Sequence, residues 1–175
     1  MKHDEVVRRF EDRTILLGVD RPGAGKFYTQ LGLEKIRELT GEAPYVETMI
    51  VWGSYLLAPL FLVGSLVLAA VALHWWTVIA APLTLLLFLY WWTSSPLANR
   101  HSRWSALLLV AAIASVFTSA GLFFKLWLIS AAASLFLIRF TYAAATFLLR
   151  CFVVRNSRAY DLWVKQGIVV VREAQ

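Results

Sequence analysis

Residues 49–73, MIVWGSYLLAPLFLVGSLVLAAVAL, open the stretch of sequence that determines the fold. From Met49 to Leu149 the chain contains no Asp or Glu, and its Lys and Arg residues are limited to Arg100, Arg103, Lys125 and Arg139. A helix needs about 20 apolar residues to cross a hydrocarbon layer roughly 30 Å thick. The stretch is therefore long enough for four crossings joined by tight turns.

Polar and aromatic residues divide this stretch into four apolar runs. The runs are Met49–Leu73, Thr77–Tyr90, Trp104 to about Phe124 and Leu126 to about Leu149, with Lys125 separating the last two. Most of the tryptophans lie within a few residues of the ends of these runs, where an amphipathic ring is most stable in a membrane. The pattern predicts an all-α integral membrane protein with four transmembrane helices in residues 48–149.

A weak internal repeat suggests how these helices are arranged. Trp52 and Trp104 open the first and third runs, and Trp76 and Trp127 lie at the turns that follow them. This spacing fits two tandem helical hairpins. Chance resemblance is the alternative, because apolar sequences resemble one another easily and tryptophan favours membrane interfaces in any case.

The composition of the whole chain excludes several classes of protein. Hydrophobic residues make up 59% of the chain and charged residues 16%, with a mean hydropathy of +0.64, so a water-soluble fold is not expected. One cysteine, Cys151, excludes an internal disulfide framework. We interpret the basic pI of 9.8 as a signal for membrane topology and for contact with lipid headgroups, and we expect no nucleic-acid partner.

The distribution of Lys and Arg predicts the orientation, because positive side chains are retained on the cytoplasmic side of a membrane. They are concentrated in the N-terminal flank, the C-terminal flank and the central loop around Arg100 and Arg103, whereas the two other turns hold only His74 and Lys125. We therefore expect a multi-pass protein of the bacterial inner (plasma) membrane with both termini in the cytoplasm.

The N-terminal cytoplasmic segment, residues 1–47, contains a candidate amphipathic helix over Lys26–Leu39, after a turn at Gly23 and Gly25. The apolar side chains that share its predicted stripe include Phe27, Leu31, Ile36 and Leu39. Three roles fit this stripe: it could lie on the membrane surface, pack against the cytoplasmic ends of the helices, or bind another subunit.

The C-terminal tail, residues 150–175, contains the β-branched run Gly167–Val171, which predicts a short strand with Ile168 and Val170 on one face. Thr14–Val19 is a similar run, so the two could pair as strands. A two-stranded ribbon alone is marginal in water and would need a partner or a cover. In the simpler interpretation, one or both runs are apolar ends packed on the protein.

Arg139 is the most informative single residue because it lies near the middle of the fourth apolar run, where no acidic residue can neutralise it. Its guanidinium could reach headgroups if the membrane segment is shifted, or bond backbone carbonyls. It could also contact another subunit or a lipid, or belong to a transport or quinone site.

The sequence gives no convincing site for catalysis, metal or cofactor. His3, His74 and His101 share no plausible site, and Arg21–Phe27 lacks the first glycine of a P-loop, since Asp20 stands there. We therefore expect no enzymatic activity, and predict an accessory or scaffold subunit that holds other membrane subunits through its helices and cytoplasmic flanks. A small oligomeric transporter or channel is the alternative, and a lipid-modifying membrane enzyme is third.

Overall fold

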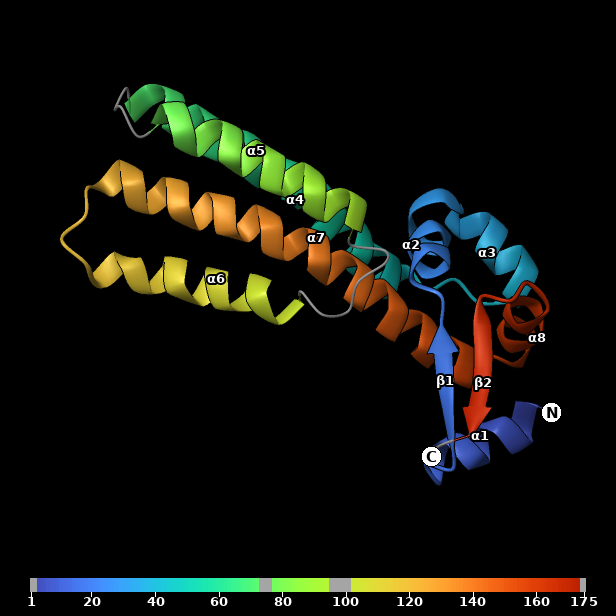
Figure 1. Cartoon of the computed structure of the whole chain (residues 1–175). Helices are drawn as coiled ribbons and strands as arrows, with labels where there is room; N and C mark the ends of the chain where they lie inside the picture. Colours follow the sequence, from blue (N-terminus) through green and yellow to red (C-terminus); the bar gives the residue numbers. More distant parts are fainter. Residues whose placement is uncertain (1–2, 73–76, 95–101, 174–175) are drawn as a thin grey trace. The chain divides into compact units, whose positions relative to one another are not determined.

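The computed structural model describes residues 3–72, 77–94 and 102–173, which are mostly helical (Figure 1). The elements in chain order are α1 (His3–Glu11), β1 (Ile15–Val19), α2 (Arg21–Gln30), α3 (Leu33–Thr40), α4 (Tyr45–Ala72), α5 (Thr77–Ser94), α6 (Ser102–Ala114), the 3₁₀ turn η1 (Ser115–Phe117), α7 (Leu122–Arg155), α8 (Ser157–Lys165) and β2 (Val169–Glu173). His74 and Arg100, which entered the topology prediction, and His101, which was considered as a ligand, lie outside the described residues.

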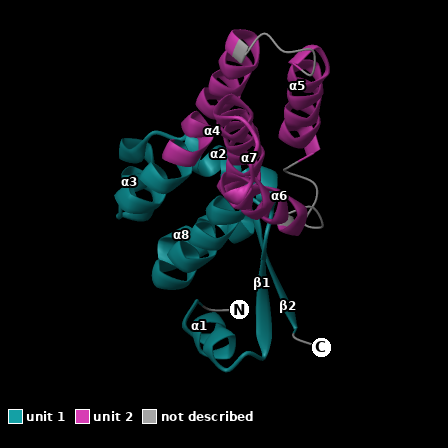
Figure 2. Cartoon of the chain, turned by 90° about the vertical axis from the view of Figure 1, so that its left-hand side faces the viewer, with its two compact units in different colours: residues 1–52, 142–175 teal, residues 53–141 magenta. Residues whose placement is uncertain are grey.

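The chain divides into two compact units (Figure 2). The first, unit 1, contains residues 1–52 and 142–175, so the two chain ends that the sequence presents as separate flanks fold together. The second, unit 2, contains residues 53–141. The long helices α4 and α7 each contribute residues to both units.

Unit 1 is organised around an antiparallel two-stranded ribbon of β1 and β2, seen as oppositely directed arrows in Figure 1. Leu17 lies opposite Val171, and Gly18 lies opposite Val170. The predicted pairing of the two β-branched runs is thus confirmed. Helix α1 contacts β1 and helix α8 contacts β2, so the ribbon has the cover that a two-stranded sheet requires.

The structure decides which face of the second strand is the inner one, which the sequence analysis left open. Val169 is 2% exposed and packs into the core, whereas Val170 is 45% exposed on the opposite face. Side chains alternate along a strand, so either face of this apolar run could have been the inner one. The pairing with β1 determines which face is the inner one, because it places Val169 opposite Val19 and Val171 opposite Leu17 on that face.

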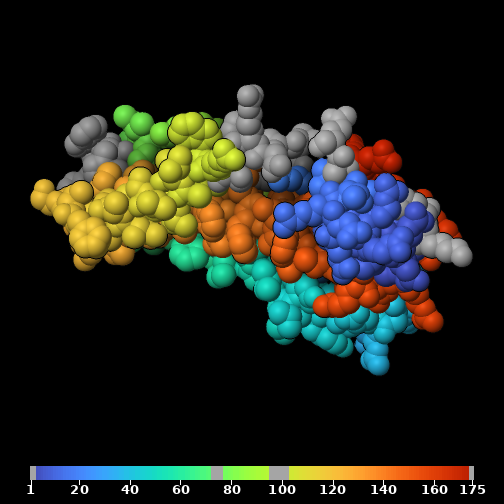
Figure 3. Space-filling view, turned by 90° about the horizontal axis from the view of Figure 1, so that it is seen from below, coloured from blue at the N-terminus to red at the C-terminus, as the bar shows by residue number. Residues whose placement is uncertain are grey.

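The core of unit 1 combines residues from both chain ends. In the space-filling view the blue N-terminal atoms lie directly against the orange and red C-terminal atoms (Figure 3). The buried side chains of this core include Val6, Ile15, Leu17, Phe27, Tyr28, Ile36, Leu149, Phe152, Val153, Tyr160, Trp163 and Val169. The C-terminal tail is thus a structural part of unit 1.

The single amphipathic helix predicted over Lys26–Leu39 is wrong, because the segment forms two helices. Leu31 leaves the helical conformation at φ −84° and ψ 123°, and Gly32, the N-cap residue that precedes α3, is also extended, with φ −65° and ψ 146°. The expected turn at Gly23 and Gly25 is also wrong: both residues lie inside α2, which begins earlier because the Asp20 carboxylate caps it by accepting a 2.8 Å hydrogen bond from the Gly23 amide.

In unit 2 the break between the last two apolar runs differs from the prediction. Helix α6 ends at Ala114, and α7 already begins at Leu122, so Lys125 lies in the first turn of α7 instead of in the connection. The Lys125 ammonium donates to the carbonyl oxygen of Val116 at 3.0 Å, which lets a charged residue sit at this helix start. The α7 helix also continues past Leu149 to Arg155.

Three of the described helices, α4, α5 and α7, are long and apolar enough to cross a membrane, whereas α6 is shorter. Within unit 2 these three long helices share a core. The buried apolar side chains of that core are Ala58, Leu62, Phe88, Trp91, Leu135 and Ile138. A buried hydrogen bond of 2.9 Å from the Thr141 hydroxyl to Ser54 Oγ also joins α7 to α4.

Candidate functional site

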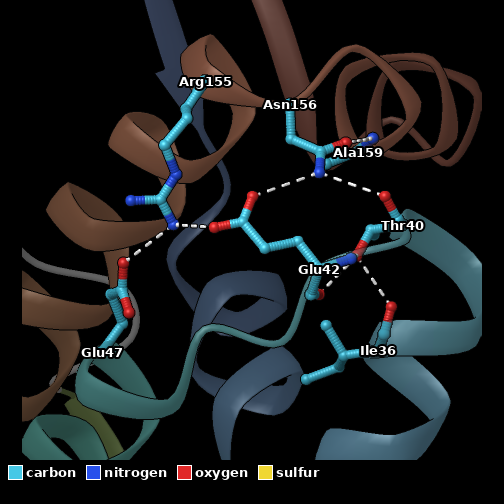
Figure 4. A network of polar contacts seen from close by, with 7 residues as sticks. All are labelled: Ile36, Thr40, Glu42, Glu47, Arg155, Asn156 and Ala159. Atoms are coloured by element: carbon cyan, nitrogen blue, oxygen red, sulfur yellow. Dashed lines mark hydrogen bonds and ion pairs between the residues drawn. The ribbon is translucent and has the colours of Figure 1, made fainter.

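A polar network in unit 1 lies where α7 ends and α4 begins (Figure 4). Arg155, the last residue of α7, places its Nη2 atom 2.7 Å from Glu42 Oε1 and 3.2 Å from Glu47 Oε1. Arg155 and Glu42 are about half exposed, so water screens these ion pairs and each contributes about 1 kcal/mol or less. The network therefore positions the chain more than it stabilises it.

Asn156 extends the network by holding two helices at once. Its side-chain oxygen accepts a 3.0 Å hydrogen bond from the Ala159 amide and so caps the start of α8, while its amide nitrogen donates to the carbonyl oxygen of Thr40 at 3.1 Å. Asparagine is a favoured N-cap, so this residue carried a local signal for α8 that the sequence prediction missed. The contact with Thr40, at the end of α3, had no local signal because the two residues are more than a hundred positions apart.

Tyr28, in α2, is fully buried in the unit 1 core close to this network. Burial raises the pKa of its hydroxyl well above the ordinary value for tyrosine; the Glu47 and Cys151 side chains act in the same direction, and Arg155 acts against them. The hydroxyl is consequently neutral at physiological pH. It has no hydrogen-bond partner among the described residues.

The residues predicted to contact partners are distributed between core and surface. Phe27 and Ile36 are 1% exposed and belong to the unit 1 core, and Leu31 and Ile168 are partly buried against it. The predicted contacts that lie on the surface are Leu39, 43% exposed, and Val170, 45% exposed.

Arg139 lies in unit 2 and is 4% exposed. Its Nη2 atom donates to Ser94 Oγ at 2.9 Å, and its guanidinium carbon lies 5.3 Å from the centre of the Trp91 ring. A cation at this distance over an indole face is attracted by the ring. The sequence analysis did not consider Trp91 and Ser94 as the groups that contact the Arg139 guanidinium. The two residues are three positions apart and so share one face of α5.

The ribbon of unit 1 presents a second surface of interest. Its outward face carries Leu16, 59% exposed and two residues before Gly18 in β1, and Val170, 45% exposed and opposite Gly18 in β2. Arg172 is exposed on the same face, directly opposite Leu16. This combination of Leu16, Gly18, Val170 and Arg172 is called the ribbon face below.

Among residues 3–72, 77–94 and 102–173, no group of three or more His, Cys, Asp or Glu side chains lies close enough to hold a metal ion. Comparison of the chain with protein-family models, with curated proteins and with solved structures gives no match.

Proposed function

We propose that this chain is an accessory or scaffold subunit of a larger membrane protein assembly, which unit 2 anchors in the membrane and unit 1 joins to a partner protein. The observation that carries the proposal is the ribbon face. The ribbon already has a filled inner face, so folding of unit 1 does not require apolar side chains on the outer one. Leu16 and Val170 are nevertheless both apolar and exposed.

The register of the strands makes these two side chains neighbours. Leu16 pairs with Arg172 and Gly18 pairs with Val170, so Leu16 and Val170 are diagonal neighbours on one face, within reach of a common contact. Gly18, which neighbours both, adds no side chain to this face. The chemistry favours a partner segment with apolar side chains and a carboxylate that can pair with Arg172.

The membrane topology that we propose has four crossings. Residues at the start of α4 and at the end of α7 belong to one folded unit, so both helix ends should lie on the same side of the membrane. An even number of crossings is then required. If α4, α5 and α7 each cross once, the apolar helix Arg103–Phe117 must make the fourth crossing. At a rise of 1.5 Å per residue this helix is shorter than a hydrocarbon layer of roughly 30 Å.

Glutamate at both Leu16 and Val170 tests the scaffold function. The double variant should remain folded, because both side chains are exposed, but should bind its membrane partner about tenfold or more weakly, since a hot spot of the contact is lost. The measurement is recovery of co-purifying membrane proteins, at fixed stoichiometry, after mild detergent extraction. Circular dichroism of the purified protein checks the fold.

Leu39→Glu is the matched control, because it places the same charge at an exposed leucine on α3. Release of the partner by Leu39→Glu, with binding retained in the double variant, would move the contact to α3 and contradict the ribbon proposal. Solute flux through the purified, reconstituted chain would favour the rival function of a small transporter. The buried Arg139 guanidinium is the feature that supports that rival.

A further inference from the structure

An open groove in unit 1 lies beside the polar network, where α4 begins and α7 ends. Its volume is about 470 Å³, within the range of small-molecule sites. The lining residues belong to the segment 42–50 and to the last part of α7. Tyr45 is the first residue of one helix that is long and apolar enough to cross a membrane, and Arg155 is the last residue of another. The groove therefore lies at the ends of two candidate membrane spans.

Charged side chains of both signs line this groove and are accessible. The Arg155 side chain is 52% exposed, that of Glu42 is 43% exposed and that of Glu47 is 18% exposed. Arg155 contacts both carboxylates through one nitrogen, Nη2, and Figure 4 shows its other terminal nitrogen without a contact to any labelled residue. The guanidinium and the carboxylates can therefore also bind a ligand from outside the chain.

Apolar side chains line the part of the groove that lies further along the two spans. Ile50 is one turn beyond Glu47 in α4 and is 41% exposed, and Leu148 is two turns before Arg155 in α7. Tyr45, exposed at the start of α4, is of a residue type that favours the headgroup level of a membrane. From the helix ends inward the lining changes from charged to apolar, which is the order of a membrane lipid from headgroup to acyl chain.

The charges of the groove discriminate between headgroups. Phosphatidylglycerol would pair its phosphate with Arg155, but it has no cation for the two carboxylates. Phosphatidylcholine has a cation, but its nitrogen carries no hydrogen to donate. Phosphatidylethanolamine supplies a phosphate and an ammonium with three donors, so every charged group in the groove can form a charge-assisted hydrogen bond.

We propose that the groove binds one molecule of phosphatidylethanolamine, whose ammonium donates to Glu42 and Glu47 and whose phosphate accepts from Arg155. An acyl chain packs against Ile50 and Leu148. The inference rests on the membrane insertion proposed above, but not on the scaffold role, because it requires no protein partner.

The test uses the full-length chain, purified in mild detergent, and native mass spectrometry of bound lipid as the concentration of one lipid is raised. One phosphatidylethanolamine should bind saturably. Its half-saturating concentration should be about tenfold or more below those of phosphatidylcholine and phosphatidylglycerol, because hydrogen bonds from its ammonium to the carboxylates are lost in both. Equal half-saturating concentrations for phosphatidylethanolamine and phosphatidylcholine would overturn the proposal.

Variants that remove charge with little change of shape assign the preference to the groove. Glu42→Gln combined with Glu47→Gln should abolish the preference for phosphatidylethanolamine over phosphatidylcholine, whereas Arg155→Gln should weaken the binding of both lipids, because both carry the phosphate. Glu38→Gln, at an exposed glutamate of α3 outside the groove, is the matched control and should keep the full preference.

Circular dichroism checks that these variants fold, as expected from the small contribution of screened ion pairs. A preference for phosphatidylethanolamine that survives in the folded double variant would refute the assignment of its ammonium to the two carboxylates.

Two further measurements distinguish a lipid from other occupants. Glycerophosphoethanolamine, which has the same headgroup and no acyl chains, should fail to displace the lipid at equal concentration; displacement would contradict the acyl-chain contact. A photo-crosslinking residue at Val46, an exposed lining residue, should join lipid in membranes. Crosslinking to another protein or to a second copy of this chain instead would eliminate the lipid site. The scaffold role fails separately: partner binding that survives the ribbon-face double variant would refute it and leave the lipid preference unchanged.

Discussion

At the scale of single residues, Tyr28 combines full burial with a hydroxyl that has no partner in the described part of the chain. Its ring makes a favourable edge-on contact with Phe27, with 4.7 Å between ring centres. The ring therefore stabilises unit 1 while the hydroxyl costs free energy. Replacing only the hydroxyl separates these two effects.

Tyr28→Phe should leave unit 1 as stable as before at neutral pH, or stabilise it by about 1 kcal/mol, because it removes an unsatisfied polar atom and keeps the ring. In the native protein the folded state holds the Tyr28 proton, whereas the unfolded chain loses it above a pKa of about 10. The titration of Tyr28 therefore does not change the free energy of unfolding below about pH 10, and it lowers that free energy as the pH rises further.

The free energy of unfolding, measured at several pH values on both sides of about pH 10, should fall less steeply for Tyr28→Phe than for the native chain. Tyr45→Phe, at a tyrosine whose ring is 55% exposed, is the control and should leave the slope unchanged. Identical alkaline slopes in the native chain and Tyr28→Phe would contradict the buried environment assigned to this hydroxyl.

At the scale of elements, α2 and α7 approach closely at Gly25. A Cβ atom at this position would lie 2.9 Å from Cε1 of Tyr142, closer than real Cβ atoms are found. Glycine inside a helix costs about 1 kcal/mol relative to alanine, so its presence in α2 needs a packing reason. The close approach of Tyr142 supplies that reason.

Gly25→Ala should therefore destabilise unit 1 by about 1–3 kcal/mol, the usual cost of overpacking, despite the better helix propensity of alanine. Thermal unfolding in detergent measures the effect. Adding Tyr142→Leu to Gly25→Ala should recover part of the loss, because the smaller side chain makes room for the new methyl group. Gly53→Ala is the control, since a Cβ at Gly53 meets no atom within 4 Å; an equal loss at Gly53 would refute the packing explanation.

At the scale of the whole molecule, the folding of both chain ends into one unit constrains the topology. Glu5 and Val170 are exposed residues from opposite ends of the chain, and both belong to unit 1. Ser119 is exposed in the connection between η1 and α7. The proposed even number of crossings places Ser119 on the opposite side of the membrane from the other two.

The single native cysteine makes this topology testable. In a Cys151→Ala background, cysteines at Glu5 and Val170 should react with a membrane-impermeant maleimide from the cytoplasmic side, and a cysteine at Ser119 from the other side. The cytoplasmic side is the one that the Lys and Arg residues of the two chain ends predict for them. Reaction of Ser119→Cys from the same side as Val170→Cys would show that α7 does not cross and would eliminate the four-crossing topology.

The sequence by itself determined the apolar helices and the two strands of the ribbon. Long runs such as Thr77–Tyr90 are local, and their hydropathy alone requires helices because an apolar environment leaves backbone groups no other way to be satisfied. The strand near Val169 was also visible locally, from its run of β-branched residues. Neither prediction needed to know what lies next to the segment.

Only the tertiary structure decided which apolar side chains are inside. Both faces of the second strand are apolar, so pairing with β1, about 150 positions away, was needed to turn Val169 inward and Val170 outward. Likewise, the stripe that includes Phe27 and Ile36 fits a membrane surface, a partner or a core equally well by period alone. The C-terminal end of α7 and helix α8 supply that core, because burial depends on neighbours brought together by the fold, whereas periodicity reports only the shape of one segment.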